Sequence, residues 1–151
     1  MHLISNRIII LLLILPLSAC DQASNFEDIE KSANQGDALS QALLGEAYVN
    51  GEGVSQDYKK AFEWYIKAAK QGNVDAQNNL GALYANGHGV AEDDKQAFEW
   101  YNKAAKQGNA QAQNNLGAAY ANGEGVIQDY KKAFEWYSKA AEQGNADAQK
   151  Y

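Results

Sequence analysis

The chain has 151 residues, enough for one domain with a modest core. Its 13 basic residues are outnumbered by 19 acids, for a net charge of −6, whereas nucleic-acid sites depend on clusters of Arg and Lys. We therefore expect no nucleic-acid partner. A single cysteine rules out a disulfide within the chain, so stability must come from packing.

Residues 1–19 are typical of a secretory signal peptide. Arg7 ends a short basic start, residues 8–15 form an unbroken apolar run, and small residues follow at Ser18 and Ala19. An apolar run of this length is too short to span a bilayer. Removal of the leader would take Arg7 with it and leave 12 lysines against 19 acids, a net charge of −7.

The leader ends in LSAC, residues 17–20, which resembles the bacterial lipobox. The resemblance implies cleavage before Cys20, attachment of diacylglycerol and acyl chains at Cys20, and a lipidated tether over residues 20–25. Two or three acyl chains anchor a protein firmly, since each buried CH₂ contributes about 0.8 kcal/mol. The alternative is an ordinary secretory leader that leaves Cys20 as a free thiol.

Asp21 follows the predicted lipidated position. In enterobacteria-like organisms such an aspartate resembles the signal that retains lipoproteins in the inner membrane. We therefore expect a protein anchored on the periplasmic face of the cell envelope, in the inner membrane rather than the outer. In a Gram-positive cell this sorting rule would not apply.

From residue 26 to residue 151 the sequence repeats every 36 residues. Residues 76–111 and 112–147 agree at 27 of 36 positions, and an earlier copy covers about 40–75. A period between 20 and 50 residues predicts a solenoid. The same register extends backwards, because Phe26-Glu27 aligns with Phe62-Glu63, so a half-repeat is expected to open the domain.

Each unit is predicted to contain two helices, a first helix such as 74–86 and a second helix such as 58–70. Aspartates stand at the N-cap position of the second helices, and glycines followed by asparagine end them. The turn between successive helices is then too short for anything but antiparallel packing. The residues concerned are Asp57, Asp93 and Asp129, Gly72, Gly108 and Gly144, and Asn73, Asn109 and Asn145.

The second helices carry a Trp-Tyr pair in every copy. On a helical wheel, the apolar residues of 58–70 fill an arc of roughly 200°, which requires two packing partners. The pairs are therefore predicted to be structural and not a stacking platform for a ligand. A glycine recurs in the first helices, and we expect another backbone to pass close to it. These structural residues are Trp64, Tyr65, Trp100, Tyr101, Trp136 and Tyr137, with Gly45, Gly81 and Gly117.

The unit AQNNLGALYANGHGVAEDDKQAFEWYNKAAKQGNA resembles the Sel-1-like repeat, a relative of the tetratricopeptide repeat. That family's pattern runs A-x-x-LG-x-x-Y-x-x-G-x-GV, then an aspartate, then KA-x-x-WY-x-KAA-x-x-G. The resemblance implies an all-α fold, a right-handed α/α superhelix. It also implies an adaptor for other proteins, with the first helices lining a concave surface.

Transferred onto this chain, the resemblance places a partner-binding groove on the first helices. The first unit differs most from the others, and we expect it to decide which partner binds. The alternative is that these residues only form solvated helix faces. The predicted groove comprises Leu39, Ala42, Leu43, Glu46, Val49 and Asn50 in unit one, Asp75, Asn78, Ala82 and Asn86 in unit two, and Gln111, Asn114, Ala118 and Asn122 in unit three.

The expected function is therefore that of a lipid-anchored adaptor for a protein or peptide. Proteins resembling this one include immunity proteins against secreted phospholipase effectors and regulators of periplasmic sensor domains, which gives two candidate partners. Some disulfide-rich members of the family bind or hydrolyse β-lactams, so an enzyme is the alternative. Against it, the sequence carries no recognisable nucleophile with its base, and we expect neither a metal nor another cofactor. His88 stands in a loop position that glutamate fills in the other units.

Overall fold

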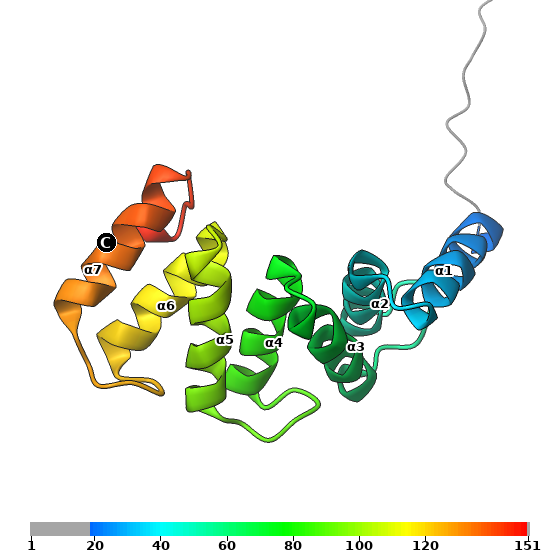
Figure 1. Ribbon diagram of the computed structural model, residues 1–151, viewed down its shortest axis with the longest axis horizontal. Helices are drawn as coiled ribbons and strands as arrows, with labels where there is room; N and C mark the ends of the chain where they lie inside the picture. The colour runs from blue at the N-terminus through cyan, green and yellow to red at the C-terminus, as the bar shows by residue number, and fades with distance from the viewer. Residues whose placement is uncertain (1–18, 151) are drawn as a thin grey trace, which may run out of the picture.

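The computed structural model describes residues 19–150, with side chains from Asn25 to Gln149. Seven α-helices follow one another along an arc, and the described residues contain no strand (Figure 1). The predicted all-α solenoid of helical hairpins is confirmed. The helices are α1 (Ala19–Asn34), α2 (Ala38–Asn50), α3 (Tyr58–Lys70), α4 (Val74–Asn86), α5 (Asp94–Lys106), α6 (Ala110–Asn122) and α7 (Tyr130–Glu142), followed by a 3-10 turn, η1 (Ala148–Lys150).

The predicted signal peptide lies outside the described residues, except for Ala19 at the start of α1. Cys20 and Asp21 belong to α1, but their side chains lie outside the described part, so lipidation and membrane sorting stay predictions. Residues 20–25, the predicted tether, also fall within α1. Between residues 19 and 150, no helix is long and apolar enough to cross a bilayer.

The helix ends are set by the capping residues that the sequence indicates. The carboxylate of Asp57 accepts hydrogen bonds from the backbone N–H groups of Lys59 and Lys60, at 3.0 and 3.1 Å, and so begins α3. Gly72 has a φ of 91°, a left-handed conformation that suits glycine. Asn73 then starts α4 by accepting from the N–H of Ala76 at 2.8 Å.

Within each hairpin, a buried tyrosine ring lies against the recurring glycine of the first helix. A Cβ atom added to Gly81 would lie 2.7 Å from the ring of Tyr101, and the same holds for Gly45 with Tyr65, at 2.6 Å. The prediction that another backbone passes close to these glycines is therefore wrong. The close neighbour is an aromatic ring, and any side chain larger than hydrogen would displace it.

The tryptophans of the same pairs lie nearer the surface. Trp100 is buried, whereas Trp64 and Trp136 are half-buried. A lysine one turn later covers each ring, and its ammonium lies 3.8, 3.9 and 4.3 Å from the ring centroids of Trp64, Trp100 and Trp136. The covered faces of these rings are therefore not open to a stacking ligand.

Neighbouring units are joined by aromatic contacts and by buried amides. Phe62 meets Tyr84 edge-on at 5.4 Å between ring centroids, and Phe26 meets Tyr48 in the same way at 6.2 Å. The helix α1 therefore supplies the half-repeat that the register predicts. Buried Gln77 donates to the carbonyl of Ala69 at 3.2 Å and accepts from Gln107 at 2.7 Å, so its amide is satisfied on both sides.

Candidate partner-binding groove

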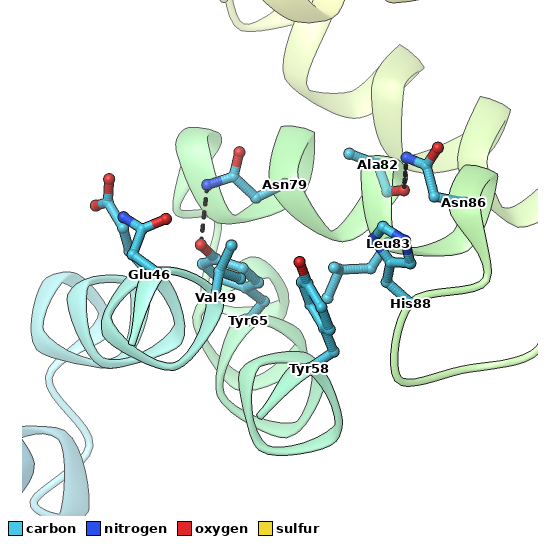
Figure 2. Close-up of a pocket in the computed structure, with 10 residues that line it drawn as sticks. Glu46, Val49, Tyr58, Tyr65, Asn79, Ala82, Leu83, Asn86 and His88 are labelled. Atoms are coloured by element: carbon cyan, nitrogen blue, oxygen red, sulfur yellow. Dashed lines mark hydrogen bonds between the residues drawn. The ribbon is translucent and has the colours of Figure 1, made fainter. Parts of the chain in front are cut away.

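The first helices of successive units touch one another: α2 contacts α4 directly, and Asn115 of α6 donates to Asn78 of α4 at 3.1 Å. A cleft of about 320 Å³ opens between α2 and α4, with α3 beneath it (Figure 2). The cleft is thus assembled from two adjacent units. Its lining residues are Glu46, Val49 and Asn50 of α2, Tyr58 and Tyr65 of α3, Asn79, Ala82, Leu83 and Asn86 of α4, and His88 of the loop that follows.

One wall of the cleft is aromatic. The ring of His88 stacks on the ring of Tyr58, with 4.6 Å between centroids and an interplanar angle of 29°. The stack forms because the loop docks on the start of α3: a Cβ atom on Gly89 would overlap the backbone of Tyr58 and lie 2.7 Å from the backbone nitrogen of Lys59. Only a glycine allows the loop to lie this close.

Two asparagines of the cleft use their amide nitrogens in hydrogen bonds within the chain. The amide nitrogen of Asn86 donates to the carbonyl of Ala82 at 2.8 Å, and that of Asn50 donates to the carboxylate of Glu52 at 3.1 Å. The amide oxygens of Asn50 and Asn86 therefore remain to accept hydrogen bonds. Glu46 is exposed and makes no ion pair with any residue in the described part of the chain.

Tyr65 lies at the base of the cleft, and its hydroxyl accepts a hydrogen bond from the amide of Asn79 at 3.3 Å (Figure 2). Burial raises the pKa of Tyr65 to about 12, the Asn79 hydrogen bond offsets part of the rise, and the charge of Glu46 adds to it. Burial, with a smaller contribution from Glu124, also raises the pKa of Tyr101 to about 12. Both hydroxyls therefore keep their protons well above neutral pH.

We expect the protein to lose stability between about pH 10 and pH 12. The folded-state pKa of Tyr101 exceeds the unfolded value of about 10, so its contribution is complete below pH 10 and is lost as pH rises through 12. The loss amounts to about 3 kcal/mol for each buried tyrosine. Urea unfolding at a series of pH values should therefore show that the free energy of unfolding falls less steeply with rising pH in Tyr101→Phe than in the unmodified chain. Tyr130→Phe, at an exposed ring, is the control, and equal slopes for all three proteins would contradict the prediction.

The structure brings some of the predicted groove residues together and separates others. Glu46, Val49, Asn50, Ala82 and Asn86 share the cleft between α2 and α4. Ala118 and Asn122 line a second cleft, of about 380 Å³, with Tyr130, Phe134 and Tyr137 near the end of the array. Leu39 and Leu43 are exposed but lie outside both clefts.

Three predicted groove residues are occupied in contacts between units. The carboxylate of Asp75 accepts from Asn109 at 3.1 Å, and Asn78 accepts from Asn115 at 3.1 Å. Gln111 accepts from Asn145 at 3.2 Å, whereas the side-chain oxygen of half-buried Asn114 has no partner in the described part of the chain. Ala42 belongs to the buried core, so its placement in the groove is wrong. Asn78, the equivalent residue one unit later, turns toward the next first helix, and this position therefore faces a neighbouring unit.

Sequence reasoning missed Tyr58, Asn79, Leu83 and His88, which also line the cleft. A signal was present in the differences between units. Position 58 is a tyrosine where the next unit has Asp94, and position 88 is a histidine where the next unit has Glu124. Both differences lie outside the first helices, and the prediction considered only the first helices.

A model of the Sel1 repeat matches three consecutive segments, residues 38–73, 74–109 and 110–145. The chain belongs to the Sel1 repeat family. Each matched unit joins a first helix to the second helix that follows, as α2 is joined to α3. The cleft therefore lies where the first unit meets the second. No significant match is found among curated proteins.

Solved structures of Sel1-like repeat proteins share the fold. A protective antigen of uropathogenic Escherichia coli is 40% identical with a TM-score of 0.79, over 87% of this chain and 32% of that protein. A Sel1 repeat protein of Oxalobacter formigenes is 36% identical with a TM-score of 0.80, over 86% of this chain and 52% of that one. The Helicobacter pylori cysteine-rich protein B is 23% identical with a TM-score of 0.68, over 83% of this chain and 93% of that one, and shows the fold alone. The chain thus spans about a third to a half of the first two structures.

Between residues 25 and 149, no group of three or more His, Cys, Asp or Glu side chains is placed to hold a metal ion. His88 is instead engaged with the ring of Tyr58. What the described groove offers is a shaped surface with hydrogen-bond acceptors, which is the chemistry of recognition.

Proposed function

We propose that this Sel1 repeat protein is a membrane-anchored, periplasm-facing adaptor that holds a protein or peptide partner in its concave groove. The observation that carries the proposal is the cleft between α2 and α4, whose lining includes residues that differ from the next unit, such as Glu46, Tyr58 and His88. A solenoid of nearly identical units presents nearly identical surfaces. A cleft whose lining departs from the repeat is therefore the part of the array suited to recognise one partner.

The anchor half of the proposal depends on Cys20. The lipobox resemblance and the absence of any other cysteine support lipidation at that residue. Labelled palmitate should enter the protein, and Cys20→Ala should abolish the label and release the protein from the membrane. A Cys20→Ala protein that stays membrane-bound would remove the anchor from the proposal and leave the adaptor role untouched.

The adaptor half is tested by crosslinking in the cell that makes the protein. A photo-reactive amino acid at Ala82 lies in the cleft, whereas one at Glu99 lies on an exposed face of α5 and serves as the matched control. We expect position 82 to capture a defined protein that position 99 does not. Identical capture patterns, or capture from position 99 alone, would overturn a partner site in the groove.

The captured protein would also separate the two candidate roles. A secreted phospholipase effector, together with survival of that toxin only when this protein is present, indicates immunity. A periplasmic sensor domain indicates regulation. Hydrolysis of β-lactams is the alternative to an adaptor, and turnover of a chromogenic β-lactam by purified protein, abolished by a point substitution, would establish it.

A further inference from the structure

Charge is segregated between the two kinds of helix. Every lysine of residues 25–149 lies on α1, α3, α5 or α7. The helices α2, α4 and α6 and the loops that follow them carry no lysine or arginine. Their charged groups are all acids, namely Glu46, Glu52, Asp57, Asp75, Glu92, Asp93, Glu124 and Asp129. The first helices and the loops that follow them are therefore acidic, and complementary charge steers association and favours a basic partner.

The cleft between α2 and α4 combines this charge with three further features. Val49 and Leu83 give it apolar contacts, the stacked rings of Tyr58 and His88 give it an aromatic wall, and its one carboxylate, Glu46, is unpaired within the described residues. The amide oxygens of Asn50 and Asn86 add acceptors at the same opening.

These features fit a long basic side chain. The aliphatic stem of lysine or arginine packs on apolar surface while its charged end stays at a polar rim. A cation is also attracted to the face of an aromatic ring and to a carboxylate. An acidic or purely apolar side chain would gain nothing from the unpaired carboxylate and the free amide oxygens.

We propose that this cleft binds a lysine or arginine side chain in a basic segment of the partner protein, with Glu46 and Tyr58 as its main contacts. The proposal rests on the adaptor function above and names the chemistry of its partner. The corresponding residues of the next pair of units do not reproduce the site: Ala82 replaces Glu46, Asp94 replaces Tyr58 and Ala119 replaces Leu83. That pair of units keeps acidic groups but has neither the tyrosine face nor the leucine.

The test uses the full chain and a fluorescent tetralysine peptide, with a tetraglutamine peptide as the uncharged probe, at physiological ionic strength. Tetralysine should bind and tetraglutamine should not. Glu46→Gln should weaken tetralysine binding about fivefold. Glu63→Gln, which removes the same charge from an exposed position on α3, should change it less than about twofold.

The aromatic contact is tested separately. Tyr58→Ala should weaken binding about three- to fivefold, and Tyr58→Phe, which keeps the ring face, should bind as the unmodified chain does. Equal losses for Glu46→Gln and Glu63→Gln would show diffuse charge attraction and overturn the site. Binding of tetraglutamine as tight as that of tetralysine would overturn it too.

The two proposals fail in different ways. A partner captured from position 82 whose binding survives both Glu46→Gln and Tyr58→Ala would leave the adaptor role in place and remove the basic-segment site. Site-specific tetralysine binding, with no protein captured through the groove in the cell, would instead overturn the adaptor role.

Discussion

Replacing Trp100 by alanine is expected to destabilise the whole array, by about 3 to 5 kcal/mol. Trp100 is buried in the same core cluster as Leu80 and Leu83 of the preceding helix. The ammonium of Lys103 covers one face of the Trp100 ring, 3.9 Å from the ring centroid. Removal of the ring leaves a cavity that the surrounding helices fill only in part. Because each unit is stabilised mainly by its neighbours, a defect in the middle unit uncouples both sides.

Urea unfolding followed by circular dichroism measures this loss. Trp136→Ala is the matched variant, since the same residue in the last unit is only half-buried, and it should cost clearly less than Trp100→Ala. A Trp100→Ala protein as stable as the unmodified chain, but unable to bind its partner, would show that the tryptophan belongs to a binding site. The structural role assigned to the Trp-Tyr pairs would then be wrong.

The helices could be predicted from the sequence because each copy carries its own boundary signals. Asp57 and Asn73 occupy N-cap positions, and Gly72 ends a helix, each by short-range chemistry that a sequence pattern records. The same signals recur at a fixed spacing, so an error in one copy is corrected by the next. The observed bounds of α3 and α4 accordingly coincide with the predicted ones.

Contacts between distant residues were harder to predict. The pairing of Gly81 with Tyr101 joins two helices of one hairpin, and a recurring glycine alone does not say whether a ring or a backbone lies against it. The cleft is likewise formed by residues from separate elements, because Glu46 lies on α2, Tyr58 on α3 and His88 in the loop after α4. The family resemblance assigns positions of the first helices to the groove one helix at a time and includes Ala42, whereas Ala42 is buried in the core.

Replacing Gly89 by alanine is expected to have the second large effect, and it links stability to the cleft. Gly89 has a φ of 72°, where a residue with a Cβ atom loses about 1 to 2 kcal/mol. The added Cβ would also overlap the backbone of Tyr58, and forced overpacking costs about 1 to 3 kcal/mol more. Backbone atoms at the start of α3 cannot rotate away as a side chain can, so the loop must move.

Gly108→Ala provides the matched control, because Gly108 has a φ of 93° but open space where its Cβ would lie. Gly108→Ala should lower the free energy of unfolding only by the cost of the left-handed backbone conformation, about 1 to 2 kcal/mol. Gly89→Ala should lower it by about 2 to 5 kcal/mol. Displacement of the loop should also separate His88 from Tyr58, which nuclear Overhauser contacts between the two rings would detect. If the two variants were equally stable and the ring contacts persisted in Gly89→Ala, the loop would not depend on this close approach. The aromatic wall of the cleft would then need another explanation.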